Sequence, residues 1–161
     1  MTDFGDLSSR WVMWSGLAGV AGASAVSDPS GRSGRFISRE QSFDVRQDGS
    51  WWVLDETDDR GKKYVETAKF STLELTEKYL TWKWASFART IRGLPALGPQ
   101  LYQQGFSGDV TVSPTSNEWR NEMTDSTGSA ILPQPDSTIF SHLMPKTLSE
   151  IDRFVGQGIE R

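Results

Sequence analysis

The sequence predicts an α+β protein in which helices pack on an antiparallel sheet. Short runs of alternating apolar and polar residues occur in two groups, at 35–70 and 109–134. A long helical pattern separates the groups, and the links between neighbouring runs are too short for parallel crossovers. We therefore expect an antiparallel sheet of short meander strands with one long and two shorter helices, in a single domain over residues 1–161.

The first helix is predicted near the N-terminus. Ser8 or Ser9 is expected to begin it, since either side chain can accept a hydrogen bond from a free backbone N–H of the first turn. Trp11 and Trp14 begin an apolar stripe at helical spacing, and Gly19 lies at the expected end. This helix should therefore present its tryptophans to the core.

The strands of the first group should follow a turn-rich segment of small residues at 21–34. Asp48-Gly49 is a tight hairpin signal, and the polar stretch 55–61 is expected to be a hairpin tip. Trp51 and Trp52 are adjacent, so one should enter the core and the other should point away. The outward tryptophan either packs under a helix or supports a binding surface.

The long helix is expected to open with a capping box, because Ser71 and Glu74 have the required spacing. Gly93 is a suitable left-handed residue at its end. The second group of strands follows, and a second capping-box pair at Thr147 and Glu150 predicts a short terminal helix.

The long helix should be apolar on one face and aromatic on the other. The face expected to pack on the sheet comprises Leu73, Leu80, Trp84, Phe87, Ala88 and Ile91. Trp82 lies roughly opposite, with Leu75 and Tyr79, because residues two apart on a helix point to opposite sides. We expect the first or last helix to cover this back stripe, with the tryptophans of the first helix as partners. The alternative is a protein-binding patch.

The long helix also carries four basic residues that are expected to form a solvated flank: Lys78, Lys83, Arg89 and Arg92.

Composition limits the classes of function. The formal net charge is −4, which argues against a nucleic-acid partner. The absence of cysteine excludes disulfides and thiolate chemistry. The N-terminus has no basic segment typical of a signal peptide, and no apolar run approaches the roughly 20 residues of a membrane-spanning helix. We expect a cytoplasmic protein that does not bind membranes.

No motif predicts catalysis or metal binding. His142 is the single histidine, and its neighbour Ser141 does not by itself indicate a catalytic arrangement. The acid-rich stretch 55–61 has no calcium-loop spacing, and the glycines of 31–35 have no helix after them to bind phosphate. We therefore expect a protein that is not an enzyme and that has no metal or cofactor, with His142 in a structural role.

An ordered set of short motifs resembles an immunity-factor family of actinobacterial toxins. Relatives of the antitoxin that neutralises the tuberculosis necrotizing toxin belong to it. The resemblance spans 34–158, and its motifs are Gly34-Arg35-Phe36, Asp48-Gly49, Asp55-Glu56, Asp59-Arg60-Gly61, the helix from Ser71 to Leu80, Ile91-Arg92, Gly93-Leu94-Pro95, Gly105-Phe106 and the closing segment 141–158.

The resemblance implies an immunity protein that binds a cognate secreted NAD(P) glycohydrolase toxin one-to-one and blocks its nucleotide pocket. Such an inhibitor needs a rigid complementary surface and no catalytic residue. The alternative is a secretion chaperone or adaptor that binds a secreted partner without inhibiting it. Exposure and anchor chemistry suggest the following partner-binding residues: Asp58, Asp59, Arg60, Tyr79, Trp82, Tyr102, Phe106 and Trp119.

Overall fold

The computed structural model describes residues 4–117 and 119–159, and it confirms the α+β class. Five helices and eight strands alternate in groups along this part of the chain. Their order is α1 (Gly5–Leu17), β1 (Ser24–Ser27), β2 (Ser33–Ile37), β3 (Ser42–Asp48), β4 (Trp51–Thr57), β5 (Lys63–Phe70), α2 (Leu73–Ile91), α3 (Gly98–Gln103), β6 (Thr111–Pro114), β7 (Arg120–Asp125), β8 (Gly128–Pro133), α4 (Asp136–Ser141) and α5 (Leu148–Val155).

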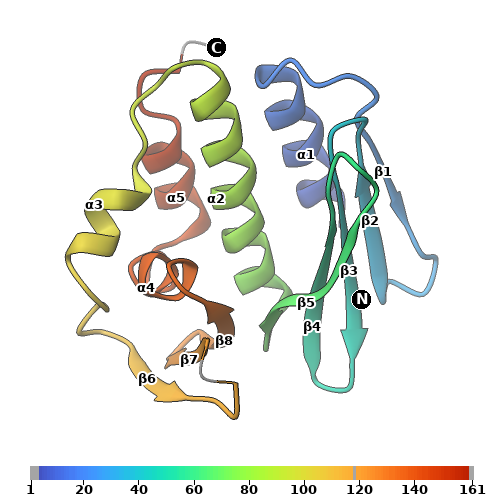
Figure 1. Cartoon of the computed structure of the whole chain (residues 1–161). Helices are drawn as coiled ribbons and strands as arrows, with labels where there is room; N and C mark the ends of the chain where they lie inside the picture. Colours follow the sequence, from blue (N-terminus) through green and yellow to red (C-terminus); the bar gives the residue numbers. More distant parts are fainter. Residues whose placement is uncertain (1–3, 118, 160–161) are drawn as a thin grey trace.

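The strands form one sheet in the order β1-β2-β3-β4-β5-β8-β7-β6, with every neighbouring pair antiparallel. The sheet consists of two meanders joined between β5 and β8. This junction pairs only Lys69 with Ile131 and Phe70 with Ala130, and Figure 1 shows the two meanders diverging from it. The first part of β5 therefore has a partner strand on one side only.

The helices cover one face of this sheet (Figure 1). α1 and α2 lie side by side, α5 packs on α2, and α4 contacts β7 and β8. The centre of the larger meander is aromatic: the Trp84 ring lies 5.0 Å from Trp11, 5.3 Å from Phe36 and 5.8 Å from Phe43, measured between centroids. Trp84 therefore faces the sheet, as predicted, in a cluster of mutually tilted rings.

Trp82 is buried under the last helix, so the prediction of a covering helix is confirmed for this residue. Its ring stacks on Phe154 of α5, with centroids 6.2 Å apart. Tyr79, predicted in the same back stripe, instead packs against Phe70 of β5 and Phe140 of α4. The partner predicted from the first helix was wrong, because Trp11 packs against Phe43 and Trp84 on the other side of α2. The two tryptophans of α2 thus pack on opposite sides of one helix within the same hydrophobic core.

Two predicted helix starts differ from the observed ones. α1 begins at Gly5, so Ser8 and Ser9 lie inside it. The cap of α2 is Thr72, whose side chain accepts a hydrogen bond from the Leu75 amide. Ser71 instead accepts a hydrogen bond from the Ser129 amide of β8, so tertiary pairing moved the cap by one residue. The Thr147–Glu150 capping box and the left-handed Gly93 are confirmed.

Three short elements were not predicted. β1 lies within the small-residue segment that was expected to contain only turns, and it pairs along the edge of the sheet with β2. α3 and α4 are each six residues long. Segments of this length carry too little periodicity to be distinguished from loops.

The solvated basic flank predicted for α2 was partly wrong. Lys78 and Arg89 are buried, 2% and 3% exposed, while Arg92 is exposed. Lys78 donates to the Met144 carbonyl. Ile91, expected on the packed face, is 57% exposed at the last residue of α2. Within the described residues, no helix is both long and apolar enough to cross a bilayer.

Candidate protein-binding surfaces

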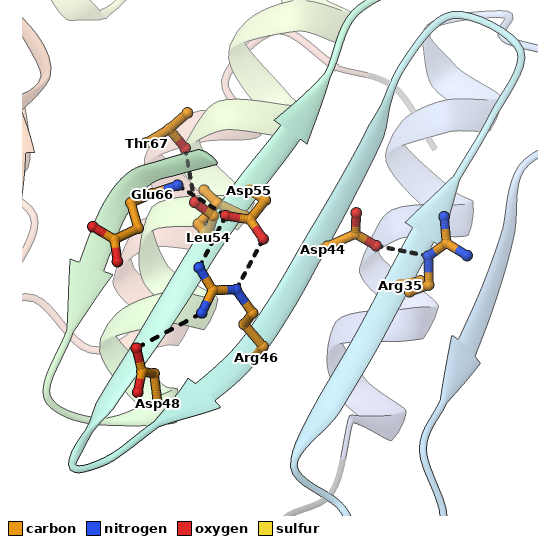
Figure 2. Close-up of polar contacts among 8 residues, drawn as sticks. All are labelled: Arg35, Asp44, Arg46, Asp48, Leu54, Asp55, Glu66 and Thr67. Atoms are coloured by element: carbon orange, nitrogen blue, oxygen red, sulfur yellow. Dashed lines mark hydrogen bonds and ion pairs between the residues drawn. The ribbon is translucent and has the colours of Figure 1, made fainter. Parts of the chain in front are cut away.

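A network of polar side chains lies on the sheet face turned away from the helices (Figure 2). Asp55 of β4 accepts hydrogen bonds from Arg46 Nε at 2.9 Å and from the Glu66 amide at 2.8 Å. Burial alone would raise the pKa of Asp55, but the Arg46 hydrogen bond, the Glu66 amide and the Arg46 charge outweigh it and lower the pKa. Asp55 is therefore a buried anion that ties β3, β4 and β5 together.

The backbone adjusts to reach this carboxylate. Glu66 has a φ of +53°, in the left-handed region that residues other than glycine seldom adopt. It lies where the register between β4 and β5 shifts, between Leu54 and Glu56. Thr67 Oγ1 donates to the Leu54 carbonyl at 3.2 Å and closes the bulge (Figure 2). The bulge is therefore fixed by specific hydrogen bonds.

Charges on this outer face pair mainly with one another. Arg35 Nε lies 2.7 Å from Asp44, and Arg46 Nη1 lies 3.8 Å from Asp48 (Figure 2). Trp51 is half-buried on this face opposite Asp48, whereas its neighbour Trp52 is in the core, as expected for adjacent strand residues. Arg35 and Arg46 are thus each paired with carboxylates of the same face.

The predicted hairpin tip is confirmed for 58–61, but 55–57 belong to β4 and Asp55 is buried, so that part of the prediction was wrong. Asp58 accepts hydrogen bonds from the amides of Arg60 and Lys62, and these, with the Lys62 amide as the main cause, lower its pKa. Asp58 therefore shapes the turn, while Asp59 and Arg60 are exposed at the tip. Figure 1 places this turn at the opposite end of the molecule from the β6–β7 turn, which carries Trp119.

Trp119 is the most exposed of the large apolar side chains described, at 75%. Its amide donates to Asn117 Oδ1, which holds the backbone of the turn. Tyr79, by contrast, is 2% exposed, and its hydroxyl donates to Asp136 Oδ2 at 2.6 Å. Burial, then the charges of Asp136 and Glu56, raise the pKa of Tyr79 well above its ordinary value.

A second surface forms around α3. We call it the α3 surface and define it by Pro99, Tyr102, Phe106, Gln134, Pro135 and Ile139. Tyr102 is 47% exposed and Phe106 is 36% exposed. A hollow of ≈ 630 Å³ is lined by all of these residues except Phe106. A neighbouring hollow of ≈ 320 Å³ shares Pro99 and Ile139 and is also lined by Trp82, Lys83 and Asp136. The structure thus brings Trp82 and Tyr102 to adjoining hollows.

Buried polar groups hold the segment that carries α3. The guanidinium of Arg89 donates to the carbonyls of Pro95, Val155 and Gln157. It therefore joins the end of α2 to the start of the α3 segment and to the end of α5. Gly98 lies so close to Trp82 that an added Cβ would be 3.2 Å from Trp82 Cζ2.

His142 closes the other end of the α3 segment. Its Nε2 lies 2.6 Å from the Gly105 carbonyl, to which it donates. Ser141 Oγ donates to the Thr138 carbonyl and accepts from the Ser107 amide. Both side chains are thus used to fix a loop. In residues 4–117 and 119–159 no group of three or more histidine or acidic side chains could hold a metal ion.

Sequence reasoning missed three of these features: the Arg46–Asp55–Glu66 network, the Arg89 clamp and the role of Asp136. A signal for the first was present, because the two-residue turn after Asp48 fixes the hairpin register and places Arg46 diagonally across from Asp55. No comparable signal existed for Arg89 and Asp136, whose partners lie on elements distant in sequence.

Comparisons with known proteins agree with this architecture. Among solved structures, Rv3902c from M. tuberculosis has a similar fold, with a TM-score of 0.72 and 18% sequence identity. The match covers 96% of this chain and 91% of that one. No protein with a curated description matches this sequence.

The family itself is given by the sequence. Residues 17–155 match the family described as Immunity protein 61. The match includes both meanders, the long helix α2 and the α3 segment. It confirms the resemblance to a toxin-immunity family that the ordered motifs indicated. The chain belongs to the immunity protein 61 family.

Proposed function

We propose that this protein neutralises a cognate secreted toxin by binding it one-to-one and blocking its active site. Family membership over residues 17–155 carries the proposal. The toxin's activity, NAD(P) glycohydrolysis, is inferred from the resemblance to relatives of the antitoxin of the tuberculosis necrotizing toxin. The protein would act in the cytoplasm of the producing cell, where a stray toxin molecule would otherwise consume its nucleotide.

The physical requirements of such an inhibitor support a binding role without catalysis. One toxin molecule turns over many substrate molecules, so inhibition must be tight, and tight binding favours a surface that is ordered before the partner arrives. The Arg46–Asp55–Glu66 network and the Arg89 clamp provide this order on two parts of the molecule. A net charge of −4 would also accelerate association with a basic toxin face.

The test is NAD hydrolysis by the toxin domain encoded beside this gene, titrated with the purified protein. We expect hydrolysis to fall linearly and to reach zero near one equivalent. Hydrolysis that continues at a large excess of the protein would contradict the proposed inhibition. If the two proteins nevertheless bind, the result would favour a secretion chaperone or adaptor instead.

A further inference from the structure

We propose that the α3 surface is the docking site for the toxin, and that it takes a toxin segment in which an apolar side chain lies next to a lysine or arginine. This inference rests on the proposed function and specifies where the partner binds. The apolar side chain would enter the hollow beside Tyr102 and Pro135, and the basic group would approach Asp136.

The composition around α3 is that of an interface centre. Residues 94–117 include one charged residue, Asp109, whereas 24% of the whole sequence is charged. Charged residues are depleted and aromatic residues enriched at the buried centres of protein interfaces. Tyr102 and Phe106 are nevertheless exposed here, at 47% and 36%. A surface segment that has one charged residue and displays two aromatic rings is suited to a protein partner.

The electrostatics of the smaller hollow select the sign of the partner's charge. Lys83 Nζ lies 3.5 Å from Glu56 Oε1 and 3.8 Å from Asp136 Oδ2. Two carboxylates thus face one ammonium group, which leaves an excess of one negative charge. The Asp136 side chain is 26% exposed and lines the hollow. A lysine or arginine from the partner would balance this charge at a partly desolvated site, where such a pair is stronger than in water.

The α3 surface is also held in place before any partner binds. Arg89 fixes the start of the segment at Pro95, and His142 fixes its end at Gly105. Gly98 packs directly on Trp82 between these points. A loop restrained at three positions loses little conformational entropy on binding, which increases affinity.

The outer face of the sheet is the rival surface. Its charged residues pair with one another, as Arg35 does with Asp44 and Arg46 with Asp55. Binding there would desolvate ion pairs that are already formed, including those of Arg46 with Asp48 and Asp55. The two surfaces lie on different elements, so one experiment separates them.

The experiment is calorimetric titration of the purified toxin domain into matched variants. Tyr102→Ala should weaken binding about 30-fold, as expected for an aromatic hot spot. Tyr64→Ala is the control, since Tyr64 has a similar exposure of 44% and lies in β5, away from α3. Asp136→Asn should weaken binding and reduce its salt dependence, whereas Asp59→Asn at the hairpin tip should change neither.

Hydrogen–deuterium exchange of the wild-type complex gives a readout that needs no variant. We expect the toxin to protect amides of 98–106 and 134–139. Unchanged affinity of Tyr102→Ala, or protection confined to β2–β5, would overturn the docking site. Wild-type binding without inhibition would overturn the proposed function alone, since the variants would still locate the surface. Absence of any binding would overturn both.

Discussion

Trp82 of α2 and Phe154 of α5 stack with their ring planes inclined by only 15° and their centroids 6.2 Å apart. This contact covers the tryptophan that faces away from the sheet, and it leaves Trp82 7% exposed. Trp82 also lines the smaller hollow beside α3. One pair of rings therefore links the hydrophobic core to the surface proposed for toxin binding.

Phe154→Ala should destabilise the fold. The substitution removes the stacked ring and uncovers Trp82, and we expect a loss of about 2–3 kcal/mol, below the value for a fully buried phenylalanine because Phe154 is half-buried. Urea denaturation followed by tryptophan fluorescence measures it. Phe106→Ala is the control: Phe106 is 36% exposed at the α3 surface, so its removal should change the unfolding midpoint little. Equal midpoints for the two variants would contradict the role of the stack.

Gly98→Ala should displace α3. The new methyl group would lie 3.2 Å from both Trp82 Cζ2 and Ile139 Cδ1, closer than most real Cβ contacts. We expect overpacking to lower the free energy of unfolding by about 1–3 kcal/mol and to weaken the affinity for the toxin. Gly108→Ala is matched to it, because an added Cβ there meets nothing within 4 Å. Thermal unfolding and calorimetric titration of both variants test this, and a Gly98→Ala protein that matches wild type in both would refute the seating of α3 on Trp82.

Asp55→Asn should reduce stability at neutral pH and remove part of the acid sensitivity. Folding lowers the pKa of Asp55. Its contribution to the free energy of unfolding is therefore complete above the pKa of the unfolded state, about 3.9. That contribution is lost as the pH falls through the lower pKa of the folded state. At pH 7 we expect a loss of about 1–3 kcal/mol, since the charged partner of Arg46 is removed.

The measurement is urea denaturation of wild type and Asp55→Asn at pH 7 and at intervals from pH 4.5 to 2.5. The difference in free energy of unfolding between the two proteins should shrink as the pH falls. Asp44→Asn supplies the comparison, because its partner Arg35 is 61% exposed and such pairs contribute less than about 1 kcal/mol. A difference that stays constant with pH would show that the carboxylate charge is not the cause.

Arg89→Lys should loosen the two segments that the guanidinium joins. A lysine ammonium cannot reproduce the planar fork that bonds the carbonyls of Pro95, Val155 and Gln157 together. We expect the free energy of unfolding to fall by about 1.5–3 kcal/mol. Amide exchange in 94–98 and 155–158 should become faster. Arg92→Lys, an exposed position three residues further on, should alter neither. Unchanged exchange in both segments of Arg89→Lys would contradict the clamp.

The order of the longer strands and helices, the hairpin at Asp48-Gly49, the terminal capping box and the direction of Trp84 were all predictable from the sequence, whereas β1, α3 and α4 were not. Each depends on local chemistry: turn residues, alternation along a strand, or a repeat of 3.6 along a helix. The family resemblance rested on the same local motifs, spread in order along the chain. Exposure of Tyr102, Phe106 and Trp119 could also be anticipated from their polar or glycine-rich surroundings.

Only the tertiary structure decided which residues meet. Lys78 and Arg89 look like surface residues of a helix, yet α5 and the segments around it bury both of them, and backbone carbonyls satisfy their charges. Thr72 rather than Ser71 caps α2, because the Ser71 hydroxyl accepts a hydrogen bond from an amide of β8. Asp136 meets Tyr79 and Lys83 across more than fifty residues of chain. A local sequence pattern predicts which face of a helix or strand is apolar. The partner of each polar group depends instead on how elements distant in the sequence pack together.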